Sequence, residues 1–269
     1  MNKIIGCIIV RSMSSRLPLK ALRYVDDKHS SLDALIKRMR LSKQLSEIYV
    51  CTTTSPYDDV LEDISYSNGI KCYRGAEEDV IERLLSVGEI EQANYLVRIT
   101  GDNVFTDPYI LDHQIEEHLL NEWDYSRTEN VPLGVTAEVM SYTALMHCAQ
   151  NIDRKLSEYL MLYMYNPDIY KVGVIDYNTS EDLSKYILTM DTSIDLKRTR
   201  EIFLKLNDRA IAAQLMEILE IVKVNDVQDV IYEPTYEVKL PMGEVVKYVE
   251  FRGLMEEKKG KSMVVPFYK

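Results

Sequence analysis

The chain has 269 residues and is 46% hydrophobic, which is ample for one large packed domain, alone or with a small appendage, and argues against wholesale disorder. Its 32 lysines and arginines stand against 43 aspartates and glutamates, and the resulting net charge of −11 argues against a general nucleic-acid-binding protein. No apolar run approaches membrane-spanning length, the first expected strand leaves no room for a signal peptide, and the four cysteines lack metal-ligand spacing. We therefore expect a cytoplasmic protein with reduced core cysteines and no membrane partner.

The first half of the chain alternates strand and helix patterns. We expect strands at residues 4–10, 47–52, 70–73 and 95–99, and helices at residues 32–45, 57–67, 78–93 (with a possible interruption near Gly88) and 108–120. This alternation predicts an α/β fold with a mostly parallel sheet flanked by helices. Ligands of such folds bind beyond the carboxyl ends of the strands.

The second half is less regular. We expect helices at residues 139–149, 156–165, 194–206 and 210–222, and strands at residues 170–176 and 187–190. The remaining tail is rich in valine, tyrosine and charge and has no clear period.

Three cations follow the first expected strand within ten residues. Arg11, Arg16 and Lys20 are mixed there with serines that include Ser14 and Ser15. Cations and hydroxyls on a loop at the carboxyl end of a parallel strand form a good receptor for a polyphosphate. The glycines of a Walker loop are missing, and a basic surface turn is the alternative interpretation.

A second polar cluster follows the strand at residues 95–99. Thr100, Gly101 and Asp102 stand there, and the glycine lets the backbone turn so that the carboxylate faces the cleft. A carboxylate in that place can hold Mg²⁺ against nucleotide phosphates. Asp107 directly precedes Pro108, and we expect it to cap the helix that begins there.

A third cluster follows the strand expected at residues 187–190. Thr192 and Asp195 have capping-box spacing, and we assign both to the start of the next helix. Asp191 is then left at the end of the strand, where it is either a structural residue or a second metal ligand.

Several stretches of the chain resemble one family. Arg11–Leu22 is similar to the A-R-x-G-S-x-R-L-P-x-K-x-L motif of cytidylyltransferases related to the spore-coat polysaccharide protein SpsF, and more distantly to CMP-sugar-acid synthetases for 3-deoxy-manno-octulosonate and acylneuraminate. The similarity continues in the family's order through Val50–Asp59, Tyr73–Arg83, Val97–Pro108, Pro132–Glu138 and Leu188–Leu196. It covers about residues 3–205.

The resemblance implies a GT-A-like, Rossmann-like nucleotidyltransferase that moves CMP from CTP to a small acidic sugar, releases pyrophosphate and serves surface polysaccharide biosynthesis. By motif position it implies that nucleotide is bound by Arg11, Ser14, Ser15, Arg16, Lys20, Thr52, Arg74, Thr100 and Gly101. It implies Mg²⁺ ligation by Asp102 and Asp191, catalytic roles for Arg11, Lys20 and Asp102, and acceptor binding by Glu138, Arg154 and Tyr159.

The chain departs from the family pattern mainly at the acceptor end. Ser14 replaces a glycine, Thr136 an aspartate and Ile187 an arginine, and residues 155–158 replace most of the usual D-R-E-H-V-T-P-Y. An unusual acceptor is one explanation. A catalytically altered nucleotide-binding protein or partner subunit, and a GT-A glycosyltransferase with a nucleotide-sugar donor, are the alternatives.

The resemblance also predicts an assembly and a division of the chain. We expect a cytidylyltransferase-like domain at residues 1–207, within which about residues 125–180 form a dimerisation and acceptor segment, and a helix and tail of unknown role at residues 208–269. A homodimer is expected because relatives are generally dimers. The Leu, Met and Tyr residues of 156–165 also cover more of a helix than one packed face needs, although burial within the monomer is the alternative.

Overall fold

The computed structural model describes residues 2–14, 16–231 and 237–268. Its main sheet has eight strands in the order β10-β7-β5-β6-β4-β1-β2-β3. These strands are β1 (Ile4–Ile9), β2 (Glu47–Thr53), β3 (Lys71–Gly75), β4 (Tyr95–Thr100), β5 (Tyr125–Glu129), β6 (Glu138–Ser141), β7 (Val172–Asp176) and β10 (Met263–Pro266). Among these described strands, neighbours run parallel except where β6 pairs with β4 and with β5.

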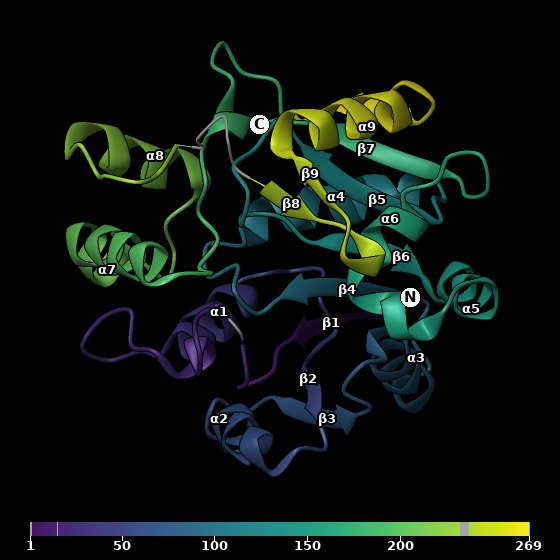
Figure 1. The fold of residues 1–269 in the computed structure, drawn as a ribbon, viewed down its shortest axis with the longest axis horizontal. Helices are drawn as coiled ribbons and strands as arrows, with labels where there is room; N and C mark the ends of the chain where they lie inside the picture. Colours follow the sequence, from purple (N-terminus) through teal and green to yellow (C-terminus); the bar gives the residue numbers. More distant parts are fainter. Residues whose placement is uncertain (1, 15, 232–236, 269) are drawn as a thin grey trace.

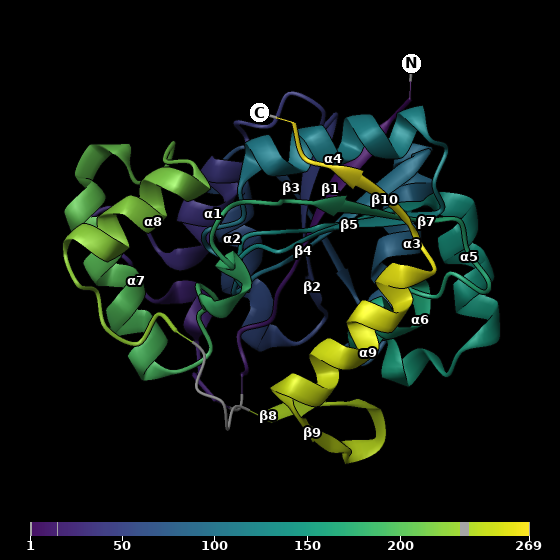
Figure 2. The ribbon, with the colours of Figure 1, turned by 90° about the horizontal axis from the view of Figure 1, so that it is seen from above.

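Helices cover both faces of this sheet, and Figure 2 shows α4 and α9 on opposite sides of it. The helices are α1 (Ser31–Met39), α2 (Asp59–Ser67), α3 (Val80–Glu91), α4 (Pro108–Leu120), α5 (Tyr142–Asn151), α6 (Leu160–Met164), α7 (Ser193–Leu206), α8 (Leu215–Val224) and α9 (Tyr248–Gly260). Successive side chains of a strand point to opposite faces, so Ile4 and Ile8 pack in the cluster that contains α1 and α4, whereas Ile5 and Cys7 pack with α3 and α5. The α/β architecture expected from the sequence is confirmed.

The first half of the chain matches its expected elements closely. Each of its four strands and four helices is present, although the helix expected to reach residue 45 ends at Met39 and α3 runs unbroken through Gly88. The cysteines are free thiols, and all but Cys72 are buried. The capping box of Thr192 and Asp195 begins α7 as expected.

The second half corrects several expectations. Strand β5 was not expected, and residues 139–149 begin in β6 and become helical only at Tyr142, because Val139 and Met140 are buried in the sheet. Residues 156–165 form a 3-10 helix, Arg154–Tyr159, followed by the short α6. The strand expected at residues 187–190 is not formed: Tyr186 and Ile187 make isolated bridges, while Met190 bonds to the loop after β4. The helix expected at residues 210–222 begins only at Leu215.

The helices α7 and α8 lie together beside the sheet (Figure 1), and two buried side chains join this part of the chain to α4 and α1. Asp107 caps α4 as expected, accepting hydrogen bonds from the Tyr109 and Ile110 amides, and it also accepts one from the Leu215 amide at the start of α8. Arg38 of α1 donates to the carbonyl groups of Ala210 and Ile211 at 3.0 and 2.9 Å. Burial lowers the pKa of Arg38 to about 10. One carboxylate therefore fixes two helix N-termini, and one guanidinium fixes the loop between α7 and α8.

The end of the chain is part of the same structure. The small hairpin of β8 (Glu237–Lys239) and β9 (Val245–Lys247) leads into α9, and β10 then adds a parallel strand beside β7. Residues 263–266, within the helix and tail of unknown role expected at residues 208–269, thus add a strand to the main sheet. No helix in the described part of the chain is long and apolar enough to cross a membrane.

A close contact at β7 gives a stability prediction. Gly173 of β7 lies against the buried Trp123, and a Cβ atom at this glycine would meet the indole ring at 2.0 Å. The ring cannot move freely, because its Nε1–H group donates to the Met263 sulfur of β10 at 3.4 Å. We expect Gly173→Ala to lower the free energy of unfolding by about 3 kcal/mol in chemical denaturation.

The matched control is Gly253→Ala in α9, where no atom lies within 4 Å of the added Cβ. Alanine is favoured over glycine inside a helix, so this variant should be more stable by about 0.5–1 kcal/mol. Equal stability of the two variants would contradict the close packing at β7.

Candidate active site

The loop that follows β1 is held by one buried carboxylate. Asp58 accepts hydrogen bonds from the Ser12 amide at 2.7 Å, from the Thr52 hydroxyl at 2.8 Å and from the Thr53 hydroxyl at 2.5 Å. Burial raises the pKa of Asp58, but the hydrogen bonds from Thr53, Ser12 and Thr52 outweigh burial and hold it below its ordinary value. The loop is closed further by the Leu19 amide, which donates to the Ser12 carbonyl group at 2.9 Å. The start of the cation-rich loop is therefore fixed.

Four of the expected site residues meet at the end of this loop. The Lys20 ammonium lies 2.6 Å from an oxygen of Asp102 and 2.9 Å from an oxygen of Asp191, and the Arg16 guanidinium lies 3.1 Å from the other oxygen of Asp191. Lys20, Asp102 and Asp191 have side chains only 13–15% exposed. Burial lowers the pKa of Lys20, but the two carboxylates raise it by more, so the lysine stays charged.

The backbone brings the two aspartates together. Gly101 follows β4 and donates its amide to the Ile9 carbonyl group at the end of β1 at 2.9 Å. A Cβ atom at Gly101 would lie 2.7 Å from the Val10 side chain, so only glycine allows this approach. The Met190 amide donates to the Asp102 carbonyl group at 3.0 Å, and this bond places Asp191 beside Asp102.

The two carboxylates fit a Mg²⁺ ion. Mg²⁺ prefers oxygen ligands and usually takes one or two carboxylates together with substrate phosphates and water. Asp102 and Asp191 already share one cation, the Lys20 ammonium. In the described ranges no group of three or more His, Cys, Asp or Glu side chains could hold a metal ion, so water or phosphate oxygens would complete a site here.

Other expected nucleotide residues lie apart from this cluster. Arg11 is exposed and pairs with Glu77 at 3.3 Å. The Thr52 hydroxyl is buried on Asp58, and Arg74 donates to the Thr53 and Ser55 carbonyl groups. Thr52 and Arg74 thus support the loops around the site in this structure. Ser14 is half-buried, and Ser15 lies outside the described residues.

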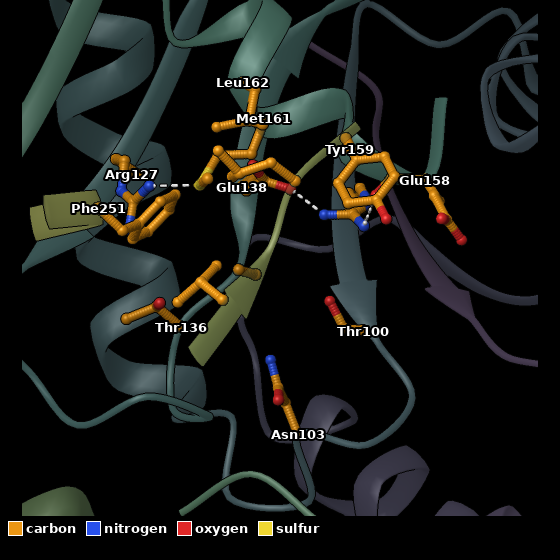
Figure 3. Close-up of a pocket in the computed structure, with 14 residues that line it drawn as sticks. Thr100, Asn103, Arg127, Thr136, Glu138, Glu158, Tyr159, Met161, Leu162 and Phe251 are labelled. Atoms are coloured by element: carbon orange, nitrogen blue, oxygen red, sulfur yellow. Dashed lines mark hydrogen bonds and ion pairs between the residues drawn. The ribbon is translucent and has the colours of Figure 1, made fainter. Parts of the chain in front are cut away.

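A pocket of about 230 Å³ adjoins the loop that carries Asp102, and Figure 3 shows the residues that line it. Thr100 and Asn103, which flank Gly101 and Asp102, line one part of it (Figure 3). The other lining residues are Arg98, Arg127, Thr136, Ala137, Glu138, Glu158, Tyr159, Met161, Leu162, Val238, Leu240 and Phe251. The pocket therefore combines charged and hydroxyl groups with an apolar wall, as small-molecule sites commonly do.

An ion pair across β4 and β6 lies in this pocket. Arg98 pairs with one carboxylate oxygen of Glu138 at 2.5 Å, and the Tyr125 hydroxyl donates to the other at 2.6 Å. Burial lowers the pKa of Arg98, but the Glu138 carboxylate outweighs burial and raises it above its ordinary value. Arg98 also donates to the Glu158 carbonyl group at 3.1 Å (Figure 3). Glu138 and Tyr159 thus belong to the pocket, whereas Arg154 is half-exposed and pairs with Asp79.

Comparison with known proteins decides the family. The cytidylyltransferase family pattern matches residues 5–228. The chain belongs to the cytidylyltransferase family. It is 32% identical over 228 residues to the spore coat polysaccharide biosynthesis protein SpsF of Bacillus subtilis strain 168, a match that covers 81% of this chain and 95% of that protein.

Solved structures agree with this family. A cytidylyltransferase from Leptospira borgpetersenii serovar Hardjo-bovis strain JB197 superimposes with a TM-score of 0.79 and 25% identity, covering 87% of this chain and all of that one. A CMP:2-keto-3-deoxy-manno-octonic acid synthetase complexed with CTP superimposes with a TM-score of 0.60 and 15% identity, over 76% of this chain and 99% of that chain, and shows the shared fold. The expected family and nucleotidyltransferase fold are confirmed.

Residues 155–158 of this cytidylyltransferase, which depart from the family pattern, make hydrogen bonds to the start of α3 and to Arg98 of β4. Ser157 is buried, and its hydroxyl accepts a hydrogen bond from the Val80 amide at the start of α3 at 2.7 Å. The neighbouring Glu158 presents its carbonyl group to Arg98. Glu158 therefore lines the pocket, while Ser157 holds this segment against the start of α3.

The apolar residues after this segment are covered within the chain. Leu160, Met164 and Tyr165 are buried in the core beneath α6, and Met161 and Leu162 pack against the same core together with Phe251 of α9. The surplus apolar surface expected to form a dimer contact is thus largely used by the monomer. The homodimer stays a prediction that depends on the resemblance alone.

Two features of the site were missed by sequence reasoning. Asp58 lies within the motif Val50–Asp59, but the motif did not show that this residue holds the neighbouring loop. The available signal was a carboxylate shortly after the threonines that end β2. Arg127 was missed because its strand, β5, was missed. An arginine between alternating small polar residues was the available signal.

Asp58 gives a testable prediction for this cytidylyltransferase. Asp58→Ala leaves the Ser12 amide and two threonine hydroxyls without their acceptor, so we expect the free energy of unfolding at pH 7 to fall by about 2–4 kcal/mol. Because the pKa of Asp58 is lowered in the folded state, its contribution to stability is present above its unfolded pKa of about 3.9 and is lost as the pH falls through the folded value.

Denaturation of wild type and variant from pH 3 to pH 7 measures this difference, which should shrink below about pH 4. Asp63→Ala, an exposed residue on α2, is the matched control and should be neutral at every pH. A difference between wild type and Asp58→Ala that does not depend on pH would contradict the role of the ionised carboxylate.

Proposed function

We propose that this cytidylyltransferase transfers CMP from CTP to a small sugar acid, sialic-acid-like or a 3-deoxy-ulosonic acid, and releases pyrophosphate in a Mg²⁺-dependent reaction. The product would serve the synthesis of a surface polysaccharide. The observation that carries the proposal is the meeting of Arg16, Lys20, Asp102 and Asp191 beside a pocket of about 230 Å³.

The cation-rich loop would bind the CTP phosphates. Arg11 and Arg16 are exposed and can turn their guanidinium groups to phosphate oxygens, and Lys20 can exchange its carboxylate partners for a phosphate. Ser14, Ser15, Thr100 and the Gly101 backbone are the further nucleotide contacts that the family motifs imply.

Asp102 and Asp191 would hold Mg²⁺, which neutralises charge on the phosphates when bound. The acceptor hydroxyl then forms a bond to the α-phosphorus of CTP, the bond from that phosphorus to the β-phosphate oxygen breaks, and pyrophosphate and a proton are released. Arg11, Arg16 and Lys20 stabilise the charge that grows on the departing pyrophosphate.

The acceptor would occupy the pocket described above. Arg98 and Arg127 offer cations to an acidic sugar, and Glu138, Thr136 and Asn103 offer hydrogen bonds to hydroxyl groups. The names of two similar proteins, one for spore coat polysaccharide biosynthesis and one for a CMP-activated 3-deoxy sugar acid, support this acceptor class. Glycosyl transfer from a nucleotide sugar has no comparable support.

Removal of either aspartate tests the proposed metal site. We expect Asp102→Asn and Asp191→Asn each to lower pyrophosphate release by about 100-fold or more, because phosphate charge would no longer be balanced. Loop carboxylates contribute little core packing, so both variants should melt near the wild-type temperature. Asp208→Asn, whose side chain is 81% exposed, is the control and should keep full activity. Full activity of an Asp102 or Asp191 variant at saturating Mg²⁺ removes that residue from the site.

Substitution of Lys20 tests separately whether this residue competes with Mg²⁺ and whether it binds the phosphates of the nucleotide. Its ammonium occupies the position between the carboxylates and competes with a metal ion there, so Lys20→Met should bind Mg²⁺ several-fold more tightly in the absence of nucleotide. The same variant should lose about 100-fold in turnover, because the phosphates lose a cation. Calorimetric titration with Mg²⁺ alone measures the first effect. Weaker Mg²⁺ binding by this variant would show that Lys20 does not compete for the carboxylates.

A further inference from the structure

A second cavity lies between the loop at residues 24–29 and α7 with the turn that follows it. Its volume of about 650 Å³ is within the range of about 300–1,000 Å³ that small-molecule pockets have. It shares no lining residue with the pocket beside Asp102. The lining residues are Tyr24, Val25, Asp26, Asp27, Lys28, His29, Arg200, Phe203, Leu204, Asn207, Asp208, Ala210 and Ile211. None of them belongs to the motifs that carry the family resemblance, so those motifs give this cavity no role.

The walls of this cavity are fixed by the protein itself. Arg200 of α7 donates from Nε to the Tyr24 carbonyl group at 2.7 Å, which ties the helix to the loop. Arg38 donates to the carbonyl groups of Ala210 and Ile211 and so holds the turn after α7. The cavity is therefore formed before any ligand binds, as small-molecule sites usually are.

Buried apolar side chains form the floor of the cavity. Val25, Phe203 and Ala210 line it and are each only 1% exposed. Tyr24 and Leu204 also line it but are 55% and 75% exposed, so they add apolar surface at its mouth. Hydrocarbon bound on this floor leaves water, which favours a ligand with an apolar part.

Carboxylates outnumber cations around the cavity, which is lined by Asp26, Asp27 and Asp208 against Lys28 and Arg200. Asp26 is already satisfied: one oxygen accepts from the amides of Lys28 and His29 at 2.8 and 2.6 Å, and the His29 ring lies 2.8 Å from the other. Burial raises the pKa of Asp26, but these hydrogen bonds outweigh burial and hold it below its ordinary value. Asp26 is thus an ionised residue that shapes the loop.

The other two carboxylates are available to a ligand. Asp27 is exposed and has no hydrogen-bond partner among the residues that the structure describes. Asp208 pairs with the Lys28 ammonium at 3.3 Å, and the two side chains are 81% and 63% exposed. An exposed pair of this kind contributes little and can exchange its partner. The ammonium of Lys28 thus stands where the ammonium of a ligand could replace it, and the net charge of −11 also attracts cations.

We propose that this cavity binds a small organic amine, with its ammonium group at Asp27 and Asp208 and its hydrocarbon part on the apolar floor. Each carboxylate can accept a charge-assisted hydrogen bond from the ammonium group, and the exposed ring of Tyr24 is a further partner for a cation. An anion of the same shape would meet two like charges, and a neutral alcohol would lack the charge. This second site goes beyond the proposed function and does not depend on it.

Three probes of similar shape test the charge of the ligand: phenethylammonium, phenethyl alcohol and hydrocinnamate. In calorimetric titrations of the full chain at about 0.1 M salt, we expect phenethylammonium to bind about five-fold more tightly than the alcohol, and hydrocinnamate to bind most weakly. Saturating CTP and Mg²⁺ should change the affinity for phenethylammonium by less than about two-fold, because the two pockets share no residue.

Variants of the two carboxylates locate the site. Asp27→Asn and Asp208→Asn should each weaken phenethylammonium binding by about three-fold or more, and both should melt near the wild-type temperature because the residues are exposed. Lys28→Met should bind the probe more tightly, since the competing ammonium is removed. Asp63→Asn is the matched control, because it removes an exposed carboxylate of α2 outside the cavity, and it should bind the probe as wild type does.

Four results would each overturn the inference. These are equal affinity for the three probes, tightest binding of hydrocinnamate, displacement of phenethylammonium by CTP, and wild-type affinity in both Asp27→Asn and Asp208→Asn. Failure of all three probes to bind at millimolar concentration overturns it as well, and none of these results bears on nucleotide transfer.

Discussion

Two carboxylates that share one cation are the constraint on which the site depends. Asp102 and Asp191 come from segments far apart in the chain, and without Lys20 between them their negative charges would repel at close range in a partly buried site. The lysine removes that repulsion in the ligand-free protein. It also keeps the carboxylates at the spacing at which another cation can replace it. The site is thus preorganised for positive charge before any nucleotide arrives.

The sheet explains why these groups meet. β1 and β4 are parallel neighbours, so the loops after them leave the same edge of the sheet. Gly101 lets the second loop pass against the first, and the Met190 amide fastens the segment of Asp191 to it. Asp58, which follows β2, accepts a hydrogen bond from the Ser12 amide and so holds the loop after β1. The loops after β1 and β4 and the segment of Asp191 therefore converge on one small volume, and each is held by a hydrogen bond that a backbone amide donates.

The sequence predicted correctly the strands and helices whose buried residues are apolar. The strands and helices up to residue 120 have apolar buried faces, and the polar clusters at the strand ends could be read directly. Strand β5 was missed because its buried positions are polar: Ser126 hydrogen-bonds His118, and Thr128 hydrogen-bonds Gln114. Burial lowers the pKa of His118 to about 3, so this histidine stays neutral in the core. A pattern of apolar periodicity cannot show such a strand.

The cation-rich loop with its two aspartates and the neighbouring pocket differ in how far the sequence alone shows them. Arg16 and Lys20 follow β1 and Asp102 follows β4, within polar clusters that the sequence shows directly. The pocket is lined by residues of β4, β5, β6, the 3-10 helix at Arg154–Tyr159, α6, the hairpin before α9 and α9 itself, so its lining comes from distant parts of the chain. The segment that carries Val238, Leu240 and Phe251 is followed by β10, which pairs with β7 between residues 90 positions apart, a contact that no local pattern records. The polar clusters of the cytidylyltransferase motifs can thus be recognised in the sequence, whereas the pocket beside them can be recognised only in the tertiary structure.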